Sequence, residues 1–187
     1  MKKYQITEWC HHFIREHVNR GDICIDATAG NGNDTLLLCE LVGEHGKVIA
    51  FDIQKEAVEN TRRRLEEQGI LERAEVLLES HTNMSRYAEA DSVSCVVFNF
   101  GYLPGGDHAL ATKKDTSIAA IHEGLGLLKK GGMMSLCIYS GGDSGFEERD
   151  AILTELKQLD SKKYLVVLSE YYNRPNNPPI PVMILKL

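Results

Sequence analysis

Residues 93–108, VSCVVFNFGYLPGGDH, hold the side chains whose types and spacing most clearly suggest chemistry. An apolar run ends at Asn99, and Tyr102 and Asp107 follow in a segment rich in Gly and Pro. An amide carbonyl accepts a hydrogen bond from an amine without adding charge. An aromatic ring packs against a base or a cation, and a carboxylate can take a proton from an ammonium group. We therefore predict that these three residues act on an amine, with core packing as the alternative for Tyr102.

A second segment, CIDATAGNGND at residues 24–34, passes from a predicted strand into a helix through a glycine-rich turn. Gly30 and Gly32 permit the tight turn and let the backbone approach a ligand closely. Asp52 ends the next strand, twenty residues after Gly32, where a carboxylate can accept both hydroxyls of a ribose. This layout predicts a nucleotide-containing cofactor.

NAD and S-adenosylmethionine both use this layout, and the residues favour S-adenosylmethionine. Thr35 occupies the position of the third glycine in the dinucleotide pattern. Asp34, near the helix N-terminus, would repel a pyrophosphate but suits a ligand with an ammonium and a sulfonium group. Asp26 is a second acid suited to the methionine amine. The alternatives are helix capping for Asp34 and turn formation for Asp26.

The loop after the third predicted strand and the residues after Asp52 supply further candidates. Ser80 and His81 are expected to border the adenine, and Gln54 the ribose or adenine, with a solvent-exposed histidine and a helix cap as the alternatives. The predicted cofactor-binding set is Asp26, Gly30, Asn31, Gly32, Asn33, Asp34, Thr35, Asp52, Gln54, Ser80, His81 and Asn99.

The elements that must position these side chains alternate along one domain, residues 1–187. We expect strands at 22–27, 47–52, 74–79, 92–100, 133–139, 164–172 and 182–187, with helices near 5–20, 33–42, 55–68, 115–130 and 144–160. Continuous apolar strands separated by helices predict a doubly wound α/β sheet. The turn NRPNNPPIP has no room for a helix, so the last strand should be antiparallel. This is the Rossmann-like, seven-stranded architecture of class I methyltransferases.

Composition and charge narrow the function classes. The net charge of −6 argues against a nonspecific nucleic-acid binder, although a local patch can still hold RNA. The candidates for such contacts are Lys113, Lys114, Arg174 and Asn176, whereas Arg62–Arg64 is expected to be a solvated helix face. The sequence shows neither a membrane span nor a signal core, so we expect a cytoplasmic protein with no membrane partner. Five cysteines without a CxxC pair are expected to be small buried side chains, and no metal site is predicted.

Four segments carry a specific resemblance: DATAGNGNDT, NFGYLPGGD, DTSIAAIHEGLGLLKKGG and NRPNNPP. Together they resemble the bacterial MnmM (YtqB-like) family over essentially the whole chain. Asn99–Tyr102 is also spaced like the N/D-P-P-Y/F motif of amine-directed methyltransferases, with Phe-Gly replacing Pro-Pro. Asn33 and Gly142 depart from the family, which usually has histidine at both positions.

The resemblance implies an S-adenosylmethionine-dependent enzyme that methylates 5-aminomethyl-(2-thio)uridine at the tRNA wobble position to the 5-methylaminomethyl form. The implied partner is the anticodon arm of tRNA. The alternatives are a small-molecule amine methyltransferase, a noncatalytic S-adenosylmethionine-binding module and, less favoured, a dinucleotide oxidoreductase. Both a monomer and a homodimer are compatible with the sequence.

Overall fold

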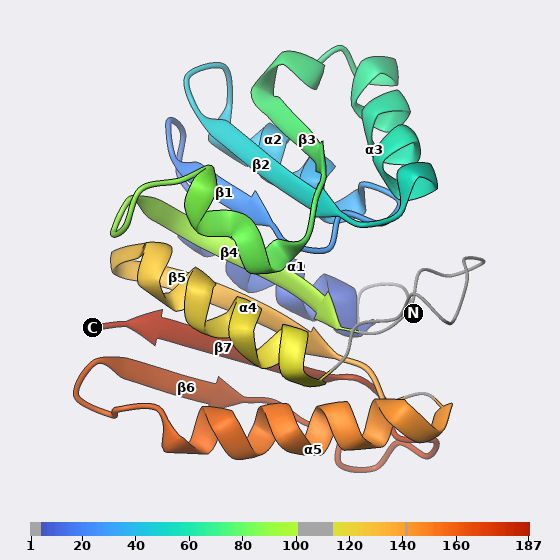
Figure 1. Ribbon diagram of the computed structural model, residues 1–187, viewed down its shortest axis with the longest axis vertical. Helices are drawn as coiled ribbons and strands as arrows, with labels where there is room; N and C mark the ends of the chain where they lie inside the picture. The colour runs from blue at the N-terminus through green and yellow to red at the C-terminus, as the bar shows by residue number, and fades with distance from the viewer. Residues whose placement is uncertain (1–4, 101–113, 141) are drawn as a thin grey trace.

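The computed structural model describes residues 5–100, 114–140 and 142–187, which form one seven-stranded sheet with helices on both faces (Figure 1). The strands are β1 (Ile23–Asp26), β2 (Lys47–Asp52), β3 (Ala74–Leu78), β4 (Val93–Phe100), β5 (Leu128–Ile138), β6 (Tyr164–Leu168) and β7 (Ile180–Lys186). The helices are α1 (Ile6–His17), α2 (Asn33–Val42), α3 (Lys55–Glu67), α4 (Lys114–Leu127) and α5 (Gly142–Gln158), with 3-10 helices η2 (Leu71–Arg73) and η3 (His81–Arg86).

The strand order is β3-β2-β1-β4-β5-β7-β6, with β7 antiparallel to both of its neighbours. The first five strands are parallel, so they end at one edge, which we call the carboxyl edge. The predicted doubly wound sheet with an antiparallel last strand is therefore confirmed. It is the sheet of class I methyltransferases.

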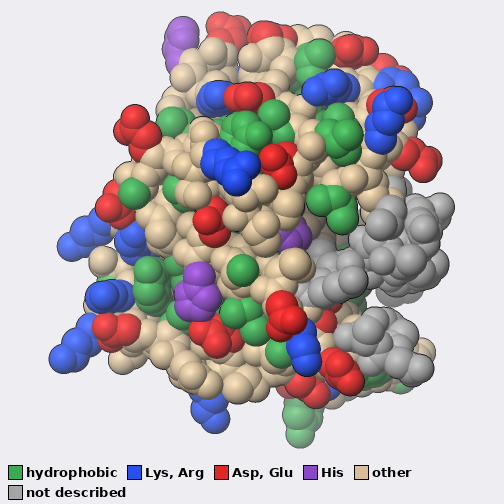
Figure 2. Space-filling view, viewed as in Figure 1, with side chains coloured by type: hydrophobic (Ala, Val, Ile, Leu, Met, Phe, Trp, Pro, Cys, Tyr) green, Lys and Arg blue, Asp and Glu red, His purple; other side chains and the backbone are tan. Residues whose placement is uncertain are grey.

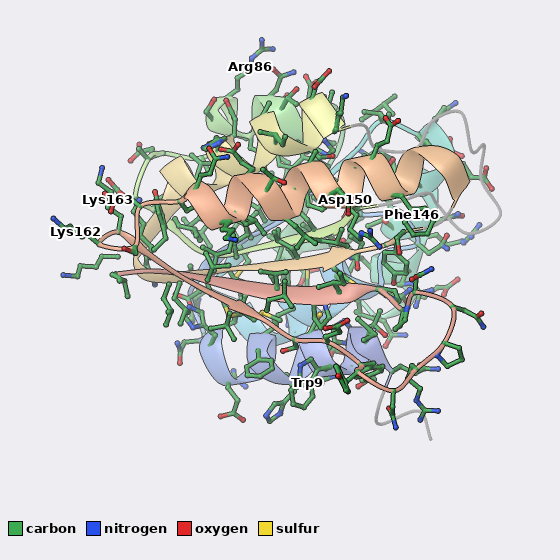
Figure 3. The ribbon with its side chains drawn as sticks, turned by 90° about the horizontal axis from the view of Figure 1, so that it is seen from below. Trp9, Arg86, Phe146, Asp150, Lys162 and Lys163 are labelled. Atoms are coloured by element: carbon green, nitrogen blue, oxygen red, sulfur yellow. The ribbon has the colours of Figure 1, made fainter. Side chains whose placement is uncertain are left out.

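The two faces of the sheet have separate cores. Helices α1, α2 and α3 cover one face, and α4, α5 and η3 cover the other. The view along the sheet shows α5 on one side and α1 on the opposite side (Figure 3). Because successive side chains of a strand point to opposite faces, Cys95 and Val97 of β4 join the α1 side, whereas Val96, Phe98 and Phe100 join the α4 side. Asn99 therefore points toward α1 and α2.

Some element boundaries differ from expectation. β5 starts at Leu128, directly after α4, rather than at 133, because Leu128 already pairs with Val93 of β4. Gly131 then takes a left-handed φ of 76°, and pairing resumes in a shifted register at Met133. β6 ends at Leu168 rather than 172, since the chain turns after the Ser169 N–H donates to the carbonyl of Pro181. The segment after β3 is the helical turn η3 instead of a loop.

Two further expectations concern the cysteines and the membrane. All five cysteines are buried free thiols, as predicted. Within the described ranges, no helix combines the length and the apolar character that crossing a membrane requires.

Candidate active site

The site lies at the carboxyl edge, where β1, β2 and β4 end side by side. Asp26 of β1 pairs with Ala50 of β2 and Val97 of β4, so Asp52 and Asn99 each lie two residues beyond that level. Open α/β sheets bind ligands at this edge, near the point where the strand order reverses. Here the reversal falls between β1 and β4, and the predicted cofactor and acceptor residues flank it.

Asp26 is a fully buried carboxyl group at the start of the glycine turn. It accepts hydrogen bonds from the hydroxyl of Thr35 at 2.6 Å and the N–H of Thr28 at 3.2 Å. Burial, together with the charge of Asp34, raises the pKa of Asp26 to about 7. The turn-forming alternative for Asp26 is therefore confirmed, and its predicted contact with the methionine amine stays a prediction. The residue in the third-glycine position, Thr35, serves to hold this carboxyl.

Side chains and backbone of α3 pack against the glycine turn and hold it in place. Gly30 and Gly32 have φ of 53° and 74°, and a Cβ on Gly32 would come within 2.9 Å of the Thr61 Cα. Arg64 donates from Nε to the carbonyl of Asn31 at 2.6 Å. The expectation of a purely solvated arginine run is therefore wrong for Arg64, because its guanidinium reaches the cofactor turn.

Asp52 ties the end of β2 to the same turn. One carboxylate oxygen accepts the N–H of Gly30 and the other accepts the N–H of Gln54, both at 2.9 Å. Each carboxylate oxygen can accept a second hydrogen bond, which leaves capacity for ribose hydroxyls. Ile53, the next residue in the chain, is a large apolar side chain that exposes 54% of its surface.

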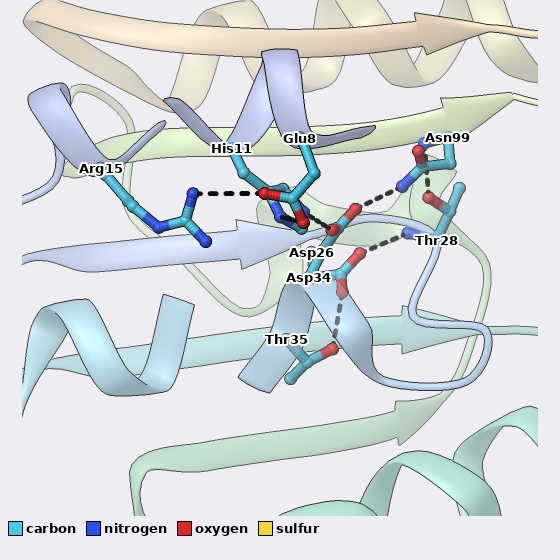
Figure 4. A network of polar contacts seen from close by, with 8 residues as sticks. All are labelled: Glu8, His11, Arg15, Asp26, Thr28, Asp34, Thr35 and Asn99. Carbon is cyan, nitrogen blue, oxygen red and sulfur yellow. Dashed lines mark hydrogen bonds and ion pairs between the residues drawn. The ribbon is translucent and has the colours of Figure 1, made fainter. Parts of the chain in front are cut away.

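Asp34 is held between the first helix and the fourth strand (Figure 4). Its Oδ1 contacts Nε2 of His11 at 2.5 Å, and its Oδ2 accepts from Nδ2 of Asn99 at 2.5 Å. The helix-capping alternative for Asp34 is wrong, because Gly32 occupies the N-cap position of α2 and no side chain caps it. His11 was missed by sequence reasoning.

The Asp34 contact defines the orientation of the Asn99 amide. A carboxylate can only accept, so the NH₂ group faces Asp34 and the carbonyl Oδ1 is the other branch of the planar amide. The backbone N–H of Asn99 donates to the Thr28 hydroxyl at 2.7 Å, which fixes the main chain at the same point. An amide held in this way presents an acceptor atom in a defined direction.

Ser80 and His81 lie beside these groups in η3. Ser80 caps the turn by accepting the N–H of Thr82. His81 donates from Nδ1 to the carbonyl of Ala27 at 3.2 Å, and its ring contacts Phe98 edge-on. Burial lowers the pKa of His81, so its imidazole is neutral near pH 7. The solvent-exposed alternative for this histidine is therefore wrong.

The remaining predicted residues are dispersed or lie outside the described residues. Asn33 is exposed at the start of α2, and Lys114 is exposed at the start of α4. Arg174 and Asn176 line a cavity in the turn before β7, at the carboxyl edge. Tyr102, Asp107 and Lys113 fall within 101–113, outside the described residues.

The groups at this edge fit S-adenosylmethionine. Two acids, Asp26 and Asp34, lie close together at this edge, and the charge of Asp34 contributes to the raised pKa of Asp26. A cationic group bound beside them would favour the charged form of both carboxylates. Asp52 retains acceptor capacity for a ribose. A pyrophosphate would instead meet two carboxylates at the start of α2.

Comparisons with known proteins agree with this geometry. Residues 48–185 match the family model described as "Putative rRNA methylase". A chloroplastic tRNA (mnm(5)s(2)U34)-methyltransferase of Arabidopsis thaliana is 36% identical, over 95% of this chain and 68% of the relative.

Solved structures of methyltransferases are also similar to this chain over nearly its whole length. A "putative rRNA-methylase" from Clostridium thermocellum is 42% identical with a TM-score of 0.95, over 98% of both chains. SMU.1697c, a "putative methyltransferase" from Streptococcus mutans solved in complex with SAH, is 36% identical with a TM-score of 0.88, over 97% of both chains.

Proposed function

The chain belongs to the rRNA methylase family described above, and from this premise we propose that it methylates the 5-aminomethyl group of (2-thio)uridine at the tRNA wobble position. The product is 5-methylaminomethyl-(2-thio)uridine. The observation that carries the proposal is the Asn99 amide, which is fixed at the carboxyl edge, and within residues 5–100, 114–140 and 142–187 no donor reaches its carbonyl Oδ1. The name of the Arabidopsis thaliana relative supports the choice of substrate.

We propose separate roles for the residues at the ends of β1, β2 and β4. Bound S-adenosylmethionine supplies an electrophilic methyl group on a sulfonium. The turn at Gly30–Gly32 and the carboxylate of Asp52 hold the nucleoside part, and Asp26 with Asp34 neutralises positive charge. Asn99 orients the acceptor amine so that its lone pair lies in line with the methyl, which is the main requirement of this displacement.

The acceptor amine has to lose its proton before it can react. A primary ammonium group loses its proton more easily when it is moved from water into a partly buried site, because burial disfavours the charged form. Asn99 supports the neutral amine, since a carbonyl oxygen accepts an N–H without adding charge. Asp107 remains a predicted proton acceptor and Tyr102 a predicted contact to the base.

A local contact surface for RNA is compatible with the acidic chain. Acidic and basic side chains are interspersed over the face that carries α4 and η3 (Figure 2). RNA binding through phosphates needs only a few well-placed cations. The proposed substrate contacts are Lys113, Lys114, Arg174 and Asn176. A cytoplasmic location and the choice between monomer and homodimer remain predictions.

The test uses tRNA purified from a strain that lacks the gene. The tRNA is incubated with the protein and S-adenosylmethionine, and its nucleosides are separated by mass. The proposal expects the 5-aminomethyl nucleoside to be converted to the 5-methylaminomethyl nucleoside. Methylation of free amines with no change in any tRNA nucleoside would instead establish a small-molecule methyltransferase.

A further inference from the structure

The cavity lined by Arg174 and Asn176 lies at the carboxyl edge, beside the proposed acceptor site. It encloses about 250 Å³ between the start of α5 and the turn that leads into β7. Arg149, Tyr172, Arg174 and Asn176 are among its lining residues. None of the roles assigned above to cofactor or acceptor amine uses Arg149 or Tyr172.

We propose that this cavity binds a nucleotide that flanks the acceptor nucleotide in the anticodon loop, and this inference rests on the proposed function. The base of the flanking nucleotide stacks on Tyr172, and its phosphate contacts Arg174 and Arg149. Single-stranded RNA is recognised in this way, since unpaired bases stack on aromatic side chains while cations follow the backbone.

The position of the cavity matches a neighbouring nucleotide. Asn99 of β4 pairs with Cys137 of β5, which pairs with Pro181 of β7. Two strand spacings separate β4 from β7, so Pro181 lies about 10 Å from Asn99. The cavity begins at Ile180, the next residue toward the carboxyl edge. A ligand that presents an amine at Asn99 has to extend beyond one nucleoside to enter the cavity.

The side chains of the cavity have the chemistry of a nucleotide site. Tyr172 exposes 95% of its surface, which is unusual for an aromatic residue and leaves its ring available for stacking. The Arg149 guanidinium lies 4.9 Å from the ring centre of Phe146 and also contacts the exposed Asp150. Figure 3 shows Phe146 and Asp150 on α5. Among the described residues, no carboxylate forms an ion pair with Arg174.

Glu170, which also lines the cavity, adds an acceptor. Its carboxylate can receive a hydrogen bond from a ribose 2′-hydroxyl or from a base N–H. A site that combines one acid with two arginines is suited to a nucleotide within a strand rather than to a simple anion.

The turn that carries these groups is held in a fixed conformation. Asn176 and Asn177 both have left-handed φ, of 66° and 46°. The carbonyl of Asn177 accepts the Ser140 hydroxyl at 3.4 Å, and the Arg174 N–H donates to the carbonyl of Tyr171 at 3.1 Å. Asparagine adopts this conformation more readily than other non-glycine residues, so both positions suit a tight turn.

The experiment measures binding of a fluorescent anticodon stem-loop at several salt concentrations, without S-adenosylmethionine, for Tyr172→Ala, Tyr172→Phe and Arg174→Ala. We expect Tyr172→Ala to weaken binding roughly 5- to 100-fold and Tyr172→Phe to retain it, because the ring does the stacking. Arg174→Ala should weaken binding and reduce the slope of log affinity against log salt by about one. Arg86, an exposed arginine in η3 on the α4 side of the sheet (Figure 3), provides the matched control. Arg86→Ala should leave the affinity and the salt slope unchanged.

Methylation of the free nucleoside and methylation of the stem-loop distinguish a failure of this inference from a failure of the proposed function. Methylation of the free 5-aminomethyluridine nucleoside should be unchanged in Tyr172→Ala, since a single nucleoside does not reach the cavity. If the wild type binds the loop through Tyr172 but does not methylate it, the proposed function fails and the cavity assignment stands. If the wild type methylates the loop and both alanine variants bind it as tightly as the wild type, the cavity assignment is overturned.

Discussion

Asp34 and Asn99, 65 residues apart in the chain, are joined by a hydrogen bond of 2.5 Å from the Asn99 amide to the Asp34 carboxylate. The first turn of α2 thus sets the orientation of a side chain at the end of β4. Because α2 also follows the glycine turn, we propose that one short segment both shapes the cofactor site and orients the acceptor amide. His11 extends this arrangement to α1.

The first prediction concerns His11, which we treat as a positioning residue. His11→Ala removes one of the two side-chain partners of Asp34, so the carboxylate and the Asn99 amide lose their fixed direction. A hydrogen bond to a charged group contributes about 1.5–3 kcal/mol, and we expect kcat to fall about tenfold or more. The KM for tRNA should change little. His11→Gln, which can still donate to Asp34, should restore much of the rate.

The neighbouring His12 is exposed on the same helix, so His12→Ala is the control and should behave like the wild type. A double variant of His11→Ala and Asn99→Ala should lose no more than Asn99→Ala alone. Independent, multiplied losses would show that His11 does not act through Asn99.

The second prediction is a dependence of stability on pH through Asp26. Its carboxyl has a pKa of about 7 in the fold, raised by burial and by Asp34, and about 4 in the unfolded chain. Between these values the folded protein holds a proton that the unfolded chain has released. Stability is therefore lost as the pH rises from about 4 to 7, by a contribution of up to about 4 kcal/mol.

The amide of Asp26→Asn does not titrate in this pH range, so the variant lacks this pH-dependent loss of stability. Urea unfolding at several pH values should show the variant gaining free energy of unfolding relative to the wild type between pH 4 and pH 7. A constant difference between the two proteins over that range would contradict the burial-raised pKa.

The third prediction concerns the glycine turn. Gly32→Ala places a Cβ at 2.9 Å from the Thr61 Cα in a residue with φ of 74°. Gly69 has a similar φ of 66° but open space around it, so Gly69→Ala carries the backbone strain alone, about 1–2 kcal/mol. We expect Gly32→Ala to lower the free energy of unfolding by clearly more and to weaken binding of S-adenosylhomocysteine. Equal losses from the two variants would contradict a close approach of α3.

The fourth prediction concerns Arg64, which contacts the carbonyl of Asn31 in the cofactor turn. Arg64→Ala should weaken binding of S-adenosylhomocysteine several-fold, measured by calorimetry, because the turn loses a charge-assisted hydrogen bond. Arg63→Ala is the control, because Arg63 lies in the same run but is exposed, and its hydrogen bond in the described part of the chain is to Asn60 of its own helix. The same affinity in both variants would remove Arg64 from the site.

The fold was predictable because the central strands β1, β2, β4 and β5 are buried on both faces and read as continuous apolar runs. The short turn before β7 excluded a helix and hence a parallel last strand. Asp26, Asp52 and Asn99 were predictable because each ends, or nearly ends, a parallel strand, so topology alone brings them to one edge.

Other features depend on how helices pack, and no local pattern reveals that. His11 belongs to an amphipathic helix, and only the position of α1 on the sheet brings it to Asp34. Arg64 looks like its two neighbours in the sequence, but it is the one that faces the glycine turn. The capping role considered for Asp34 failed because Gly32 begins the helix and Asp34 turns toward β4.

The most direct test of the account follows the wobble nucleoside of tRNA with the wild type and with Asn99→Ala. After incubation with S-adenosylmethionine, the wild type should convert 5-aminomethyl-(2-thio)uridine to its N-methyl form in the mass spectrum. Asn99→Ala should bind S-adenosylhomocysteine yet convert about 100-fold more slowly, because the amine is no longer aligned. Full conversion by Asn99→Ala, or no methylated wobble nucleoside with the wild type, would contradict the account.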